Sequence, residues 1–277
     1  MQGRTYVAEG DVTYNVDYFR LERTGVPATL TPTPSSTPQI TATPTITQTP
    51  TITSTPDLGT GTGPRTISYD YDPLYRLTAA DYSTGAFYHY TYDAVGNRLT
   101  TTDQFSVTIY QYDIANRLTS VDGVHYSYDD NGNLLNDGVN TYAYDSANRL
   151  SVVGGQQSAT YAYNGLGDRL SQNGVNYTLD LNAGLTQVLS DGTSTYLYGN
   201  GRIAQTGNSS EYFLGDVLGS VRQLTNNSGQ VTLAKSYDPY GVVTNTSGVS
   251  QSDFAYTGEA TDANGLVYLR ARYYNPL

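Results

Sequence analysis

Tyrosines alternate with polar residues in short runs along most of this chain. Tyr110 and Tyr112 lie two positions apart with Gln111 between them, so on a strand both rings point to one face. Asp113 follows directly, and the apolar Leu118 comes five residues later. The pattern predicts a β-hairpin in which Leu118 returns opposite Tyr112 on the buried face.

The loop of this hairpin is expected to consist of Ile114, Ala115 and Asn116. A three-residue loop favours a type I turn followed by a residue in the left-handed αL conformation, and Asn tolerates that conformation well. Asn116 stands at the position that needs it. Arg117 is then expected to pair with Asp113 across the mouth of the hairpin, on the face away from the tyrosines.

The same pattern recurs along the chain. Because an array with a regular period buries apolar surface only where its units stack on their neighbours, the repeats predict one continuous structure. Versions of the hairpin begin at intervals of 16 to 21 residues, at Tyr69, Tyr90, Tyr110, Tyr126, Tyr142, Tyr161, Tyr177 and Tyr196.

Tight turns are expected within and between these hairpins. The repeat YLYGNGRIA contains Asn200-Gly201, which predicts a two-residue type I′ loop. Turns between hairpins are predicted at Asp122-Gly123, Asp137-Gly138, Gly154-Gly155, Asn173-Gly174 and Asp191-Gly192. Hairpins joined in this way form a meander, and a long meander twists and coils. The predicted fold class is all-β: a long antiparallel meander of hairpins forming a curved, spiralling sheet.

Composition agrees with this fold class and narrows the function. The chain has 28 Tyr and 28 Gly, no Cys, and a net charge of −11. Tyr favours strands and Gly favours turns. Without Cys there are no disulfides or thiolate metal sites. An acidic chain without a basic stripe is not expected to bind nucleic acid, and without a long apolar run no membrane span is expected.

Changes of character divide the chain into four segments. Residues 1–25 contain an alternating strand pattern that resembles the last strand of a carbohydrate-binding jelly-roll module, with its partners expected upstream of residue 1. Residues 26–64 are rich in Thr and Pro and predict an extended linker. The hairpin repeats occupy residues 65–210, and a distinct segment occupies residues 211–277. The opening looks like the middle of a strand, so the chain is expected to be a piece of a longer protein.

No catalytic, cofactor-binding or metal-binding residues are predicted, and the chain is not expected to be an enzyme. The two histidines, His89 and His125, lie in strand patterns next to Tyr, without a serine elbow or a zinc motif. Asp129 opens a loop with Asp or Asn at alternate positions, but Leu134 stands where a calcium loop needs glycine, and Asn140 stands where it needs Glu. The better interpretation of that loop is a turn.

The repeated phrases resemble YD repeats, the building units of RHS (rearrangement hotspot) proteins. Three further phrases are similar to the RHS repeat-associated core domain: DVLGS at Asp216–Ser220, YDPYG at Tyr237–Gly241 and RARYY at Arg270–Tyr274. The resemblance covers residues 66–277. It implies a scaffold in which the repeats spiral into a hollow shell around a C-terminal toxin or effector, with the core domain closing one end.

Some members of that family cut themselves with a pair of aspartates that follow the RARYY signature. The given sequence stops at Leu277, before that segment, and Asn275 stands where many relatives have Asp. The resemblance therefore does not imply self-cleavage here, and the purified chain is expected to keep its full length.

Two functions from different classes follow. The first is structural: part of a secreted or cell-surface shell that encloses or presents a C-terminal effector polypeptide missing from this chain. The second is a module in which tyrosine faces contact carbohydrate or a cell surface. Stacking between hairpins is the favoured role for the tyrosines, which favours the shell. No cofactor is expected in either case.

Overall fold

The computed structural model describes residues 5–8, 12–17, 20–24 and 66–277. The chain divides into two compact units, residues 1–46 and 47–277. The predicted Thr/Pro-rich linker, residues 26–64, lies outside the described residues. Within the described part of the chain, no helix has the length and apolar character needed to cross a membrane.

The first unit contains a small antiparallel sheet. Its strands are β1 (Thr5–Ala8), β2 (Val12–Asp17) and β3 (Arg20–Thr24), in that order. The sequence predicts β2 but places its partners upstream, whereas both neighbours of β2 come from the chain itself. The alternating pattern identifies a strand without saying which segments pair with it.

The second unit is a meander in which each strand pairs with the strands before and after it in its sheet, as predicted. The first sheet contains β4 (Ile67–Tyr71), β5 (Leu77–Tyr82), β6 (Phe87–Tyr92), β7 (Arg98–Asp103), β8 (Val107–Tyr112), β9 (Leu118–Val121) and β10 (Val124–His125). The second contains β11 (Ser127–Tyr128), β12 (Leu134–Asn136), β13 (Thr141–Tyr144), β14 (Leu150–Gly154), β15 (Ala159–Tyr163), β16 (Arg169–Gln172) and β17 (Val175–Asn176).

A third sheet of the second unit contains strands on both sides of residue 210. It contains β18 (Thr178–Asp180), β19 (Gln187–Ser190), β20 (Thr195–Tyr198), β21 (Arg202–Thr206), β22 (Ser210–Gly215), β23 (Val221–Asn226), β24 (Val231–Tyr237) and β25 (Val243–Gly248). A single 3₁₀ turn, η1 (Tyr256–Gly258), precedes a last small sheet of β26 (Ala260–Thr261), β27 (Val267–Tyr268) and β28 (Tyr273–Tyr274).

The hairpin around Asp113 has the predicted geometry. The Asn116 N–H donates to the Asp113 carbonyl at 2.9 Å, and Asn116 is in αL with φ of 60°. The Asp113 carboxylate accepts from the Arg117 backbone N–H at 2.9 Å and from Arg117 Nε at 2.7 Å. Tyr112 pairs with Leu118. The loop is thus held by a side chain that accepts from its own backbone, which is why Asp recurs there.

The same five-residue turn recurs throughout the second unit, in residues 211–277 as well as in the repeats. In each turn the first N–H donates to the fifth carbonyl, and the fourth N–H donates back to the first carbonyl. The turns begin at Asp72, Asp93, Asp113, Asp129, Asp145, Asn164, Asp216, Asn226, Asp238 and Asp262. The loop at Asp129 is therefore a turn, as predicted. The phrases DVLGS and DPYGV are further copies that the sequence reading treated as a separate signature.

A β-bulge accompanies each of these loops except the one at Asp262. In the hairpin around Asp113, Gln111 pairs with Ser120 while Tyr112 pairs with Leu118, so Thr119 has no partner in the register. The hydroxyl of the second tyrosine of a repeat then donates to a carbonyl of a neighbouring strand; Tyr112 donates to the Arg98 carbonyl at 3.0 Å. Equivalent bonds run from Tyr92 to Leu77, Tyr128 to Leu118, Tyr163 to Leu150, Tyr198 to Val188 and Tyr237 to Val221. These bonds give a physical reason for tyrosine rather than phenylalanine.

The prediction of a two-residue type I′ loop at Asn200-Gly201 is wrong. A type I′ turn needs positive φ at both central residues, and neither residue is among those with positive φ in the described part of the chain. The bulge pairs Tyr198 with Arg202, which leaves three residues in the loop, and the Gly199 N–H donates to the Gly201 carbonyl at 2.9 Å. The turns predicted between hairpins do follow the expected chemistry: Asp122, Gly123, Asn173 and Gly174 all have positive φ.

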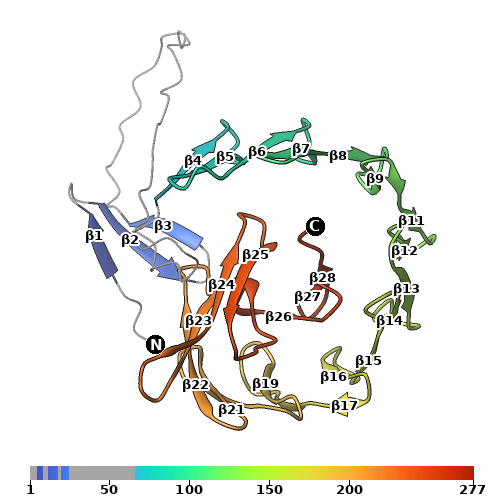
Figure 1. Ribbon diagram of the computed structural model, residues 1–277. Coiled ribbons are helices and arrows are strands. Elements are labelled where there is room, and N and C mark those ends of the chain that lie inside the picture. Colours follow the sequence, from blue (N-terminus) through green and yellow to red (C-terminus); the bar gives the residue numbers. More distant parts are fainter. Residues whose placement is uncertain (1–4, 9–11, 18–19, 25–65) are drawn as a thin grey trace, which may run out of the picture. The chain divides into compact units, whose positions relative to one another are not determined.

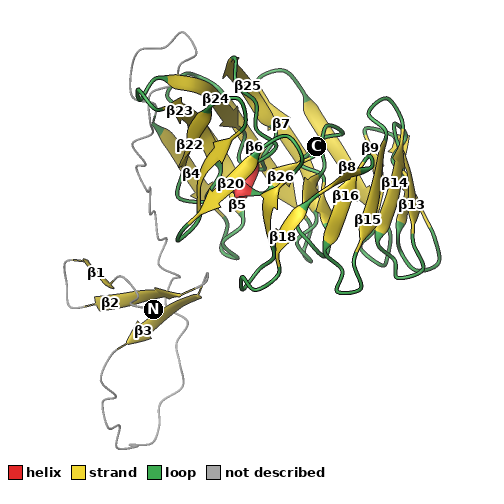
Figure 2. Cartoon of the chain, turned by 90° about the horizontal axis from the view of Figure 1, so that it is seen from below, coloured by secondary structure: helices red, strands yellow, loops and turns green. Residues whose placement is uncertain are grey.

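The strands β4–β25, residues 66–248, form a curved strip that we call the wall. Residues 249–277, which we call the inner segment, lie on its concave side (Figure 1). Figure 2 shows the strands of the wall side by side from below. The inner face is lined by the buried first tyrosines of the repeats, Tyr90, Tyr110, Tyr142, Tyr161 and Tyr196. The curved sheet predicted from the sequence is therefore confirmed. The position of the inner segment on the concave side was not predicted.

Candidate functional site: the inner face of the wall

The position of the arginine relative to the five-residue turn decides which side chain of a hairpin points inward. In the Asp113 hairpin five residues separate Tyr112 from its partner Leu118, so Leu118 faces inward. The Asp93 turn carries one extra residue before its arginine, and Tyr92 therefore pairs with Arg98. Because successive strand residues face opposite sides, this insertion turns Arg98 inward and leaves Leu99 outside the register.

Arginine faces inward at three points of the wall, after a five-residue turn at Arg98 and Arg169 and after a three-residue loop at Arg202. Arg98, Arg169 and Arg202 are each the first residue of a strand and pair with Tyr92, Tyr163 and Tyr198. Where arginine is instead the fifth residue of the turn, it stays at the loop beside its aspartate, and the leucine that follows faces inward. Arginines of that second kind are Arg76, Arg117 and Arg149.

Arg169 holds the inner segment through a buried ion pair. Its Nη1 lies 2.7 Å from the Asp262 carboxylate, and both side chains are only 3% exposed. The guanidinium also stacks on Tyr268 at 4.2 Å from the ring centroid. Burial acts to lower the pKa of Arg169, but the Asp262 carboxylate outweighs burial and raises that pKa above its usual range.

Arg202 makes a second attachment, and Arg98 joins distant parts of the wall. The Arg202 guanidinium lies over the Phe254 ring at 3.1 Å from its centroid, and Nη1 donates to the Gly258 carbonyl at 2.9 Å. Burial lowers the pKa of Arg202. Arg98 lies 4.7 Å from the ring centroid of Tyr240, in the turn between β24 and β25. The β6–β7 hairpin, near the start of the wall, therefore meets the last hairpin of the wall, β24–β25.

Pairs of tyrosine hydroxyls strengthen these attachments. Tyr163 of the wall and Tyr273 of the inner segment share a hydrogen bond of 2.9 Å between their hydroxyls. Tyr92 and Tyr240 share one of 2.5 Å. The Tyr274 hydroxyl donates to the Tyr240 carbonyl at 2.7 Å. Each hydroxyl pair joins parts of the chain more than a hundred residues apart, 110 and 148 respectively.

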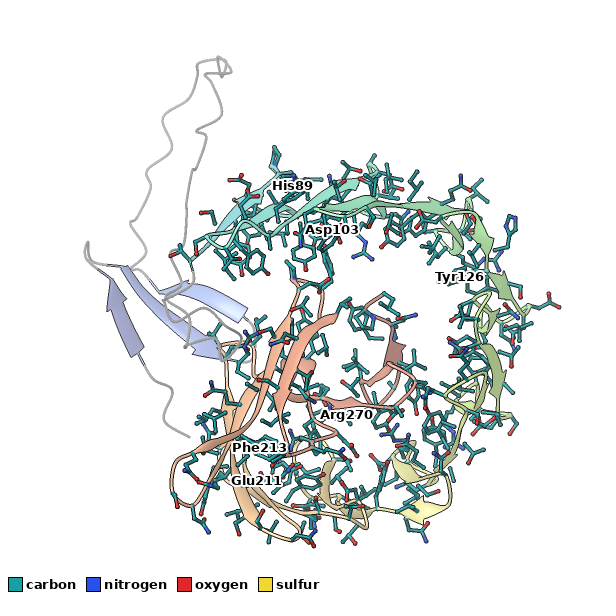
Figure 3. All side chains as sticks on the ribbon, in the orientation of Figure 1. His89, Asp103, Tyr126, Glu211, Phe213 and Arg270 are labelled. Atoms are coloured by element: carbon teal, nitrogen blue, oxygen red, sulfur yellow. The ribbon has the colours of Figure 1, made fainter. Side chains whose placement is uncertain are left out.

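A buried carboxylate, Glu211, fixes the start of the inner segment. It accepts hydrogen bonds from Gln205 at 3.0 Å, from Thr232 at 2.6 Å and from Ser250. Burial acts to raise the pKa of Glu211, but the hydrogen bonds from these groups outweigh it and lower that pKa. The sequence reading missed this cluster, because its members are far apart in the chain and belong to no motif. Glu211 and Phe213 are labelled in Figure 3.

The histidines do not assemble a catalytic site. His89 Nε2 lies 2.9 Å from Asp81, and both side chains are about half exposed (Figure 3). His125 is on β10, whose two residues are exposed. Among the described residues, no group of three acidic, histidine or cysteine side chains gathers where it could hold a metal ion. The chemistry of the inner face is that of binding polypeptide: aromatic rings, hydroxyls and three guanidiniums.

Hairpins of this type, curled around an inner segment of the same chain, define a wall built from YD repeats. The chain belongs to the Teneurin YD-shell family, whose model matches residues 51–277. This confirms the resemblance to YD-repeat and RHS proteins read from the sequence. The second unit is accordingly a shell-type scaffold.

Curated relatives are much longer than this chain. It is 34% identical over 230 residues to the tRNA nuclease WapA of Bacillus subtilis (strain 168) and to the tRNA3(Ser)-specific nuclease WapA of Bacillus spizizenii. Each alignment covers 74% of this chain and 10% of the relative. The chain thus corresponds to about a tenth of each relative.

Parts of larger solved structures are also similar to this chain. A Photorhabdus luminescens Tc holotoxin pore is 18% identical, with a TM-score of 0.39, and the match covers 76% of this chain and 16% of the other. The crystal structure of TcdB2-TccC3-Cdc42 is 17% identical, with a TM-score of 0.40 and the same coverage.

Proposed function

We propose that this chain is part of the wall of a secreted or cell-surface shell that encloses or presents a C-terminal effector polypeptide. The observation that best supports the proposal is that the inner face of the wall binds polypeptide. It holds the inner segment through the Arg169–Asp262 ion pair, the Arg202–Phe254 contact and the Tyr163–Tyr273 hydroxyl pair. An inner face with this chemistry suits a shell that contains protein rather than a small molecule.

The chemistry of the whole protein is assigned to the effector in this proposal, not to the wall. The WapA relatives are named as tRNA nucleases, and this chain corresponds to a tenth of their length. A toxin such as a nuclease is therefore the kind of effector we propose. The net charge of −11 suits a wall that does not itself attract RNA.

The coding sequence beyond codon 277, and the protein that it specifies, test this proposal. We expect the core segment to continue and an unrelated domain to follow. In that full-length product, limited proteolysis should spare the unrelated domain while the wall is folded. Arg169→Ala should expose that domain to the protease, whereas Arg117→Ala, at an exposed turn pair, should not.

Two results would reject the proposal. One is a stop codon directly after the codon for Leu277. The other is an effector domain that is digested equally fast with and without a folded wall.

A further inference from the structure

Three turns at one end of the wall stand side by side. In an antiparallel meander alternate turns lie at the same end of the strands, so the β4–β5, β6–β7 and β8–β9 turns share one end. Arg76 Nη1 donates to the Asp93 carbonyl at 2.7 Å, and the Asn97 amide donates to Asn116 Oδ1 at 3.0 Å. These bonds join each turn to the next. We call this end of the wall the turn rim; Figure 2 shows loops along both ends of the strands.

The turn rim carries large apolar side chains that the wall does not bury. Four residues of the three turns are at least 65% exposed: Leu74, Tyr75, Val95 and Ile114. We call these four residues the apolar ridge. Single exposed apolar residues are common on protein surfaces, but a contiguous row of them marks an interaction surface.

The apolar surface continues along the rim beyond the ridge. Arg98, which follows the β6–β7 turn, contacts Tyr240 in the β24–β25 turn, so this second turn is at the same rim. The β22–β23 turn lies at the same end of the third sheet. In that turn Val217 is 89% exposed, and Leu218 is exposed as well. Apolar tips spread over several turns of a rim match a broad, flat surface rather than a pocket.

The backbone at Tyr75 indicates that its ring is needed on the surface. Tyr75 stands at the fourth position of its turn and has a φ of 62°, which costs free energy for a residue with a Cβ. The other nine turns of this type in the described part of the chain hold Gly or Asn at that position. Strain of this kind is typical of functional positions.

Backbone donors of the ridge are already satisfied within the turns. In the β4–β5 turn the Asp72 carboxylate accepts from the N–H groups of Leu74 and Arg76. The Asp72 carbonyl accepts from the Tyr75 N–H, and Pro73 has no N–H to satisfy. Unsatisfied backbone groups are what keep most loops out of lipid. A turn of this construction can therefore approach an apolar phase at low cost.

Charges of the ridge turns nearly cancel. Asp72 pairs with Arg76, and Asp113 pairs with Arg117. Asp93 is bonded to the neutral Asn97 instead. Attraction to anionic lipid requires a cluster of basic side chains, and these three turns do not provide one. The net charge of the chain, −11, opposes an anionic surface further.

We propose that the apolar ridge docks the wall on a membrane surface of zwitterionic phospholipid. The side chains of Leu74, Val95 and Ile114 enter the boundary between headgroups and acyl chains, as the apolar face of an interfacial helix does. The ring of Tyr75 lies at the level of the headgroups, where tyrosine is favoured. This contact uses the rim and not the inner face, so it does not depend on whether the shell encloses an effector.

The test is flotation of the full chain, residues 1–277, with phosphatidylcholine vesicles and with phosphatidylglycerol vesicles. We expect the chain to float with phosphatidylcholine and to bind phosphatidylglycerol more weakly. A ridge variant should lower the partition coefficient at least about tenfold, because burying even one large apolar side chain contributes about that factor. Its four changes are Leu74→Ala, Tyr75→Asn, Val95→Ala and Ile114→Ser. Each copies the residue at the same position of the Asp145 turn, within residues 146–148, so the variant should fold, as thermal unfolding will show.

A matched control lies at the opposite end of the strands. Phe105 is 84% exposed and stands in the β7–β8 turn, which is at the other rim. Phe105→Ser removes an equally exposed apolar side chain and should leave vesicle binding unchanged.

A single tryptophan reports whether the ridge enters the membrane. The chain has no Trp, so Ile114→Trp and Phe105→Trp each introduce the only one. With phosphatidylcholine vesicles the emission of the Ile114→Trp variant should shift to shorter wavelength and be quenched by brominated lipid. The emission of the Phe105→Trp variant should not change.

Four outcomes would overturn the proposal. The first is failure of the chain to float with phosphatidylcholine, and the second is binding to phosphatidylglycerol alone. The third is equal binding by the ridge variant, or an equal loss in Phe105→Ser. The fourth is self-association in sedimentation velocity that the ridge variant abolishes, without vesicle binding, because it would assign the ridge to a second copy of the chain.

Discussion

Arg169 and Asp262, 93 residues apart in the chain, form a buried ion pair of 2.7 Å between the wall and the inner segment. The single substitution Arg169→Ala leaves an unpaired carboxylate in the interior. We expect it to lower the free energy of unfolding by about 3–5 kcal/mol, measured by chemical denaturation. Arg117→Ala, at an exposed pair, should cost less than about 1 kcal/mol.

The double variant Arg169→Met, Asp262→Leu separates the ion pair from packing. Because an apolar pair removes both buried charges, it should recover most of the loss. Equal destabilisation by the single and the double variant would show that the charges themselves contribute nothing.

Tyr163→Phe tests the hydroxyl network. The Tyr163 hydroxyl bonds the Leu150 carbonyl at 2.7 Å and the Tyr273 hydroxyl at 2.9 Å. Removing it leaves buried partners unsatisfied, so we expect a loss of about 1–3 kcal/mol in the free energy of unfolding. Tyr212→Phe, whose hydroxyl bonds the exposed Asn227, should change stability by less than about 0.5 kcal/mol. If Tyr163→Phe has the same free energy of unfolding as the unaltered chain, the role given to this hydroxyl is contradicted.

Tyr75→Asn should stabilise the protein. Tyr75 occupies the αL position of its turn with φ of 62° and is 82% exposed, so its ring adds little packing while its backbone is unfavourable. We expect a gain of about 0.5–1 kcal/mol in thermal or chemical unfolding. Leu74→Asn, one residue earlier and without positive φ, is the control and should be close to neutral. A loss of stability in the Tyr75 variant would mean that the ring packs in solution.

The turn carboxylates predict loss of stability in acid. The backbone N–H of the arginine in the same turn lowers the pKa of Asp72, Asp113 and Asp145 below the ordinary 3.8. A lowered pKa means that the ionised form is favoured in the folded state, so this stability is present above about pH 4 and is lost as pH falls through the folded pKa. Urea unfolding measured from pH 7 to pH 2 should show the decline. In a variant with Asn at all three positions, the free energy of unfolding should depend less on pH. An unchanged dependence would show that other groups cause the loss of stability in acid.

Asp238 should behave in the opposite way. Burial raises its pKa above 3.8, against the hydrogen bonds from Val242 and Tyr240. The protonated form is therefore favoured in the folded state, and the ionised group opposes folding at neutral pH. Asp238→Asn, which keeps an oxygen for the turn as Asn226 does, should stabilise the chain at pH 7. That gain should disappear as pH falls through the raised pKa. Asp113→Asn at pH 7 should be destabilising, and a shared sign for both variants would contradict this account.

The local structure of each hairpin was determined by the sequence itself. Asp113 and Asn116 are three residues apart and interact within one turn, so their residue types are enough to predict the loop, the αL position and the pairing of Tyr112 with Leu118. The all-β meander follows because each unit pairs with the next along the chain. The turn at Asp129 was predictable for the same reason.

Only the tertiary structure decided how the hairpins meet the inner segment. One additional residue between the start of the turn and the arginine turns Arg98 and Arg169 inward. That consequence depends on the bulge register, which the alternating pattern does not encode. The type I′ loop at Asn200-Gly201 was wrongly predicted for the same reason, because the bulge register sets the length of that loop. The partners of Arg169 and Glu211 come from segments far apart in the chain, so their contacts arise when the wall curls. Local interactions specify each hairpin because their entropic cost is small, whereas the docking of residues 249–277 depends on contacts that no short stretch of sequence contains.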